Sequence, residues 1–184
     1  MSIKSTPIAL PESGEIAIAS KKSHGFSIIF NYVEVLKPLP SVLLAYIGAG
    51  AAVIAGGGQL TARLGLVAVA ALIASAGANG LTNYLDRDID NRLRRTCWRA
   101  LPSKRINPPK KVLPLIISLI MAGLALAWML HPCVFAADAG GTLVAATWRK
   151  KVTCVFPQGV LASCAPVLMG WLAIRQSLTL ELWQ

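Results

Sequence analysis

The sequence predicts an all-α membrane protein with about five transmembrane helices and a cytoplasmic N-terminus. Of its 184 residues, 55% are apolar and only 14% are charged, about half the charged share of a typical soluble domain. Charge-free runs, each longer than the ~20 residues that a spanning helix needs, occupy residues 38–62, 64–85, 112–137 and 152–174. The net charge of +10 comes entirely from the segments outside these runs. This pattern excludes a soluble enzyme, a disordered tail and a histone-like protein.

Residues 1–36 are expected to form a polar leader ahead of the membrane domain. Lys4 is followed by no long apolar segment before Glu12 and Glu15, so the leader lacks the pattern of a signal peptide. It also carries acidic residues and no arginine, which disfavours a mitochondrial presequence. We therefore expect the transmembrane domain to occupy residues 37–184.

The distribution of basic residues predicts the number of spans in this domain and their orientation in the membrane. A cytoplasmic loop is expected at 86–111, and spans at about 38–57, 64–85, 112–130, 131–148 and 154–174. The fourth span is the weakest because it contains Asp138. Cytoplasmic loops are enriched in Lys and Arg, and five spans with the N-terminus inside place all 18 basic residues there except Arg63 and Arg175. Without the fourth span, a basic cluster would lie outside: Arg149, Lys150 and Lys151.

The end of the second expected span carries the most informative polar residues. Asn79, Asn83, Asp86 and Asp90 are spaced by four, three and four residues, so they share one face if the helix continues through Asp90. Two carboxylates one turn apart repel each other and are poorly solvated at a membrane boundary, and a divalent cation removes this conflict. Mg²⁺ is usually held by one or two carboxylates together with substrate phosphates. The cluster therefore predicts half of a Mg²⁺–diphosphate site.

The expected loop 86–111 carries nine of the basic residues. Five of them are candidates to neutralise phosphate oxygens, for which arginine suits bidentate contact: Arg94, Arg95, Arg99, Lys104 and Arg105. Asp88 faces away from Asp86 and Asp90 on a helix and is expected to be solvated. The alternative is that these charges are ordinary interfacial anchors. The aligned polar face and the density of charge favour a site that binds Mg²⁺ and a diphosphate anion.

These residues also resemble a known family. The segment from Asn83 to Asp90, N-Y-L-D-R-D-I-D, resembles the first aspartate-rich motif of the UbiA-type intramembrane prenyltransferases, and within them most resembles the protoheme IX farnesyltransferases, or heme O synthases. The resemblance covers about residues 34–183. Its other motifs follow in the family's order: Leu36-Lys37-Pro38, Arg95-Thr96, Arg99-x-Leu101, Ile106-Asn107-Pro108, Lys150-Lys151-x-Thr153 and Ala165-Pro166 to Gly170-Trp171.

The resemblance implies a fold, a reaction and a location. The fold would be the N-terminal part of a nine-helix prenyltransferase bundle in a bacterial inner membrane. The reaction would transfer the farnesyl group of farnesyl diphosphate to protoheme IX (heme B) and give heme O, with heme B as a substrate and not a fixed cofactor. The resemblance would place Mg²⁺ on Asp86 and Asp90, with Asn83 in support. The five candidate loop cations would hold the diphosphate. Cytochrome oxidase assembly factors are an implied partner class, and nucleic acid is not.

The resemblance also carries departures. Thr82 stands where the family has the Asn four residues before the first aspartate, and Ala100 and Lys104 stand for its usual Pro and Gly. Family members have about nine spans and a second aspartate-rich motif, so we expect this chain to be a truncated copy. Asp138 does not match that motif, and we expect it to be non-catalytic. Two alternatives stay open: a prenyltransferase with a quinone or other aromatic acceptor, and a non-catalytic membrane subunit or assembly partner.

Overall fold

The computed structural model describes residues 27–59, 62–147 and 155–175, and every regular element in these ranges is helical. Residues 27–35 form a short helix, here called helix 27–35. The longer helices and one 3-10 turn follow in this order: α2 (Pro38–Ala55), α3 (Ala62–Asp90), η1 (Pro109–Val112), α4 (Leu113–Leu130), α5 (Pro132–Thr147) and α6 (Val155–Arg175). The expected all-α class is confirmed.

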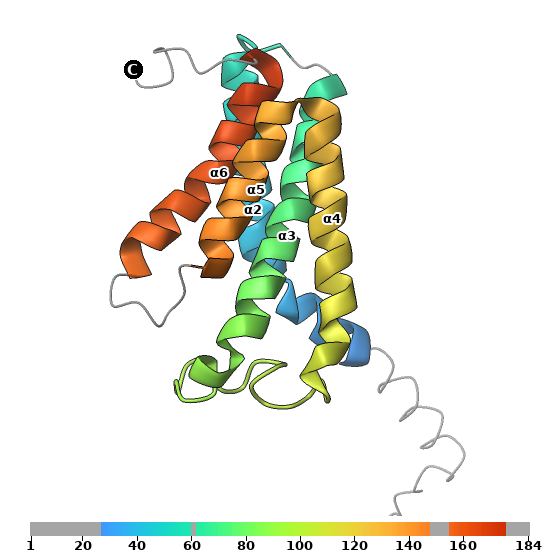
Figure 1. Ribbon diagram of the computed structural model, residues 1–184, viewed down its shortest axis with the longest axis vertical. Helices are drawn as coiled ribbons and strands as arrows, with labels where there is room; N and C mark the ends of the chain where they lie inside the picture. Colours follow the sequence, from blue (N-terminus) through green and yellow to red (C-terminus); the bar gives the residue numbers. More distant parts are fainter. Residues whose placement is uncertain (1–26, 60–61, 148–154, 176–184) are drawn as a thin grey trace, which may run out of the picture.

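The helices form one bundle in which consecutive helices run up and down (Figure 1). Each of α3, α4 and α5 packs against its neighbours in sequence, and α2 contacts both α3 and α6. The first and last long helices of the described chain therefore lie side by side. Helix α3 is the longest of the described helices, and at the end where the loop to α4 begins it extends beyond α5 and α6 (Figure 1).

Small residues let these helices approach closely. A Cβ added at Gly123 of α4 would lie 2.9 Å from the Ala74 Cα of α3, and one added at Gly77 would lie 3.0 Å from the Ile120 backbone nitrogen. Gly170 of α6 lies directly against the Gly48 carbonyl of α2. Such contacts between small residues are the usual basis of helix association in membranes, where burial of apolar surface gives no driving force.

The outer surface of the bundle is apolar, which fits a lipid environment. Large side chains such as Leu39, Tyr46 and Met129 are more than 70% exposed. In the part of the chain that the structure describes, three segments are long and apolar enough to cross a membrane: Pro38–Ala55, Ala62–Asp90 and Pro109–Leu130. These observations identify an all-α, multi-pass membrane protein.

Helices α5 and α6 lie close to the expected fourth and fifth spans. Asp138, the charge that weakened the fourth span, is only 5% exposed because it faces the interior of the bundle. The count of five spans, the cytoplasmic N-terminus and the expected domain limits stay predictions. Residues 27–35, expected within the polar leader, form a helix whose Asn31 and Val35 side chains are buried.

The loop between α3 and η1, residues 91–108, folds back onto the bundle. Ala100, Leu101 and Ile106 of this loop are buried in one cluster with Val35 of helix 27–35 and Ile116 of α4. Burial of these apolar side chains fixes a segment that otherwise consists mainly of turns. The loop cations are therefore held in defined positions at the end of α3.

Gly123→Ala is expected to lower the free energy of unfolding by about 1–3 kcal/mol, the usual cost of forcing a carbon into a packed interface. The added methyl would meet the backbone of α3 and push α3 and α4 apart. The measurement is the midpoint of thermal unfolding in detergent. Gly140→Ala is the matched control because its Cβ meets nothing within 4 Å, and alanine favours a helix by roughly 0.5–1 kcal/mol over glycine. Equal midpoints for the two variants would contradict the close approach.

Candidate functional site

The polar face of α3 begins with a residue that joins two helices. Asn79 Nδ2 donates a 3.0 Å hydrogen bond to Ser41 Oγ on α2. Ser41 Oγ in turn donates to the Leu36 carbonyl, also at 3.0 Å. These bonds satisfy polar groups inside the bundle, where an unpaired group is costly. Asn79 therefore serves the packing of α2 on α3.

Asn83 lies one turn further along α3 and ties helix 27–35 to it. Its Nδ2 donates a 2.7 Å hydrogen bond to the Val35 carbonyl, and the side chain is 7% exposed. The carbonyl of Val35 lies at the C-terminal end of helix 27–35, where backbone acceptors lack partners within the helix. Asn83 thus has a structural function, and it also lines the cleft described below.

Asp86 and Asp90 lie on the same face and are both buried. Asp86 is 7% exposed and Asp90 is 1% exposed, whereas the Asp88 side chain is 81% exposed and lies 3.5 Å from Arg87 Nε. The helical period produces this difference, because i and i+4 share a face and i+2 points away. The structure therefore places two carboxylates on one buried face of α3 and leaves the third in solvent.

The 91–108 loop supplies a cation to the second carboxylate. Arg99 Nη1 donates to Asp90 Oδ2 at 3.2 Å, and Thr96 Oγ1 donates to the Asp90 main-chain carbonyl at 2.9 Å. A buried charge is tolerated when it is paired and hydrogen-bonded. A cation close to the C-terminus of a helix also interacts favourably with the helix dipole. The loop thereby caps α3 and compensates Asp90.

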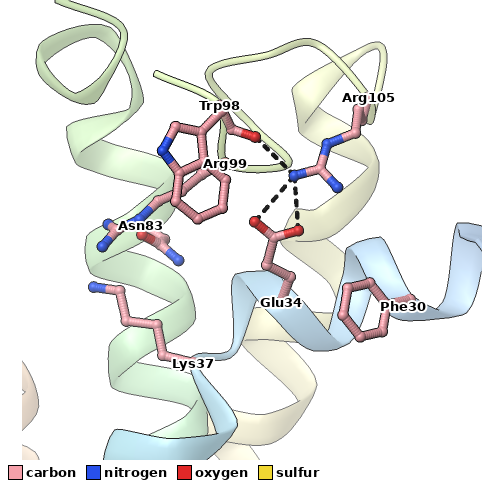
Figure 2. A pocket seen from close by; sticks show the side chains of 7 residues that line it. All are labelled: Phe30, Glu34, Lys37, Asn83, Trp98, Arg99 and Arg105. Atoms are coloured by element: carbon pink, nitrogen blue, oxygen red, sulfur yellow. Dashed lines mark hydrogen bonds and ion pairs between the residues drawn. The ribbon is translucent and has the colours of Figure 1, made fainter. Parts of the chain in front are cut away.

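A second arginine attaches the same loop to helix 27–35 (Figure 2). Arg105 Nη2 lies 2.8 Å from Glu34 Oε2 and donates to the Trp98 carbonyl at 2.8 Å. Its Nη1 donates to Asn31 Oδ1 at 2.9 Å. The guanidinium thus contacts two side chains of helix 27–35 and one carbonyl of its own loop, an arrangement suited to its planar fork of donors.

A cleft of about 510 Å³ lies between these elements. Helix 27–35, the turn before α2, helix α3 and the 91–108 loop all contribute to it. Figure 2 shows the seven side chains that line it: Phe30, Glu34, Lys37, Asn83, Trp98, Arg99 and Arg105. Three cations and a single carboxylate therefore face this space, with two aromatic rings beside them. The arrangement suits a ligand with an anionic group and an apolar part.

The structure brings only some of the expected site residues together. Asn83, Arg99 and Arg105 line the cleft. Asp90 is not among the lining residues, but it accepts a hydrogen bond from Arg99, which is. Asp86 is buried on the same face of α3 but does not line the cleft. The remaining expected cations are exposed on the loop and do not line the cleft: Arg94, Arg95 and Lys104. The catalytic, metal-binding and diphosphate-binding assignments of all these residues stay predictions.

The donor set fits a Mg²⁺ that shares its coordination with a substrate. Within residues 27–59, 62–147 and 155–175, no group of three or more His, Cys, Asp or Glu could hold a metal. Asp86 and Asp90 supply two carboxylates one turn apart. Mg²⁺ characteristically uses one or two carboxylates and completes its octahedron with phosphate oxygens and water. The site therefore fits a Mg²⁺–diphosphate unit better than a metal enclosed by protein ligands alone.

Sequence reasoning missed four of the cleft residues: Phe30, Glu34, Lys37 and Trp98. A signal existed for one of them, because Lys37 lies in the Leu36-Lys37-Pro38 motif. The positive charge of Lys37 was interpreted only as one of the basic residues that orient the spans. The other three lie in helix 27–35 or in the 91–108 loop, and no local pattern marks them as neighbours.

Comparison with known proteins agrees with this architecture. The model of the UbiA prenyltransferase family matches residues 41–184. Among curated proteins, the chain is 37% identical over 157 residues to the protoheme IX farnesyltransferase of Desulforudis audaxviator, covering 81% of this chain and 49% of the relative. The protein of the same name from Rhizobium etli is 30% identical over 182 residues, with coverage of 94% and 54%.

The protoheme IX farnesyltransferase of Salinispora tropica is 32% identical over 181 residues, covering 93% of this chain and 55% of the relative. The chain thus spans about half the length of the curated relatives it matches. No solved structure matches it. Because the family model covers most of the chain, the chain belongs to the UbiA prenyltransferase family.

Proposed function

We propose that this chain binds farnesyl diphosphate and takes part in transferring its farnesyl group to protoheme IX, giving heme O. The observation that carries the proposal is the ion pair between the buried Asp90 and the partly exposed Arg99, beside a cationic cleft at the end of an apolar bundle. Family membership supports prenyl transfer, and the names of the similar proteins support protoheme IX as the acceptor. Heme B would then be a substrate.

The chemistry follows from the charges around the cleft. Asp86 and Asp90 would hold Mg²⁺, which when bound supplies positive charge that stabilises the departing diphosphate. Arg99 and Arg105 would donate hydrogen bonds to phosphate oxygens, and such charge-assisted bonds to an anion are stronger than bonds between neutral groups. These donors assist most when they are fixed before the reaction, and Arg99 is already held by Asp90.

The apolar bundle would shelter the farnesyl chain and the allylic cation that forms as its C–O bond breaks. Exclusion of water from this cation favours its capture by the acceptor over hydrolysis. Glu34 and Asn31 would keep the Arg105 guanidinium in place while the ligand binds. Arg94, Arg95 and Lys104, which lie outside the cleft, would contribute to the attraction of the anion through their charge.

We further propose that the protein lies in a bacterial inner membrane with five spans and a cytoplasmic N-terminus. The basic 91–108 loop would then lie on the cytoplasmic side, as the distribution of Lys and Arg favours. Farnesyl diphosphate would bind with its head group at that surface and its chain in the bundle. Lipids and cytochrome oxidase assembly factors complete the proposed partners.

Farnesyl transfer is tested by incubating the purified chain in detergent with Mg²⁺, farnesyl diphosphate and protoheme IX. The expected product is heme O, identified by its mass. Parallel reactions contain a quinone precursor or another aromatic acceptor in place of protoheme IX. A farnesylated aromatic compound in the absence of heme O would assign the other acceptor class. Failure of the parent chain to bind farnesyl diphosphate with Mg²⁺ would refute the enzymatic proposal and favour a non-catalytic membrane subunit.

Asp90→Asn is expected to weaken Mg²⁺-dependent binding of farnesyl diphosphate at least tenfold, because a neutral amide replaces a carboxylate that would ligate the metal. The measurement is isothermal titration calorimetry in detergent, with thermal unfolding as the check on the fold. Asp88→Asn is the matched control, since this carboxylate is exposed on the opposite face of α3. If both variants bind like the parent, Asp90 is not a metal ligand.

A further inference from the structure

Lys37 has an unusual backbone conformation for its residue type. It joins helix 27–35 to α2 with φ 50° and ψ 66°, in the left-handed region. Glycine is the usual residue at such a position after a helix, because it lacks the Cβ that makes this region unfavourable. The following Pro38 also disfavours a continued right-handed helix at Lys37. The backbone conformation of this turn would therefore favour glycine or asparagine over lysine at position 37.

Backbone hydrogen bonds hold this turn. The Lys37 nitrogen donates to the Glu34 carbonyl at 3.2 Å, and the Ser41 nitrogen donates to the Lys37 carbonyl at 3.1 Å. Both bonds involve main-chain atoms, so they would survive replacement of the side chain. A non-glycine residue held in a sparsely populated conformation suggests that its side chain serves a purpose.

The side chain of Lys37 lines the same cleft as Arg99 and Arg105. Figure 2 shows its ammonium group on the side of Asn83 and Arg99, with Arg105 across the cleft. Arg99 pairs with Asp90, and Arg105 pairs with Glu34. Counting Lys37, the lining residues carry a net positive charge even with Glu34 included, and such a cleft attracts anions.

We propose that Lys37 binds the diphosphate of the prenyl donor, opposite Arg105 and next to Arg99. This inference rests on the proposed function and adds a residue to its diphosphate site. A lysine ammonium is a compact charge with three donors on a flexible stem, which suits a phosphate oxygen. The diphosphate is the anion that fits, because Arg99 joins this cleft to Asp90, one of the two carboxylates proposed to hold Mg²⁺.

Three substitutions separate this binding role from a role in the turn. Lys37→Met keeps most of the stem and removes the charge, so the affinity for farnesyl diphosphate with Mg²⁺ is expected to fall roughly tenfold or more, the usual effect of losing a hydrogen bond to a charged group. Lys37→Gly should lose as much affinity while unfolding at the same or a higher temperature, because glycine suits the left-handed turn. Lys37→Arg keeps the charge and should bind within a few-fold of the parent.

The control is Lys110→Met, which removes an exposed lysine of η1 that does not line the cleft. Affinities are measured by calorimetry on the whole chain in detergent, and inorganic diphosphate is added as a competitor. The expected result is parent-like binding by the control and weaker competition by inorganic diphosphate in Lys37→Met and Lys37→Gly than in the parent.

Several outcomes would overturn the assignment. If Lys37→Met does not fold, Lys37→Gly decides, and a folded glycine variant with parent-like affinity contradicts the proposal. Weaker binding of protoheme IX with unchanged binding of farnesyl diphosphate would assign Lys37 to the acceptor carboxylates instead. If the parent chain itself binds no farnesyl diphosphate, the proposed function fails first. If the parent chain binds farnesyl diphosphate and the Lys37 variants bind it equally well, only this inference is refuted.

Discussion

The burial of a carboxylate at the end of an apolar helix governs the arrangement of this end of the bundle. Asp90 is 1% exposed, and a buried charge must be compensated by a cation and by hydrogen bonds. Arg99 supplies the cation, so the 91–108 loop must fold back over the end of α3. The position of the loop then determines which of its other side chains reach the cleft.

The same loop also depends on helix 27–35. Arg105 contacts Asn31 and Glu34, and Ile106 packs in the cluster that contains Val35. Asn83 of α3 holds the carbonyl of Val35 from the other side. Helix 27–35, the loop and α3 thus form one connected network of polar and apolar contacts. A ligand in the cleft would touch all three elements and would stabilise their arrangement.

The sequence alone determined the features that depend on local periodicity and composition. Long charge-free runs predicted apolar helices, and the structure has helices close to each expected span. The spacing of Asn83, Asp86 and Asp90 predicted a shared face, and all three are buried. The period of the helix also separated Asp88, which is exposed. These predictions succeeded because the face of a residue on a helix depends only on its position along that helix.

Only the tertiary structure determined which charged side chains line the same cleft. Five loop cations were equivalent by sequence, yet only Arg99 and Arg105 of these five line the cleft. Lys37 joins them from the turn before α2. The hydrogen bond between Arg105 and Asn31 links residues 74 positions apart. Such contacts depend on how an irregular loop packs against distant helices, and neither periodicity nor local propensity records that packing.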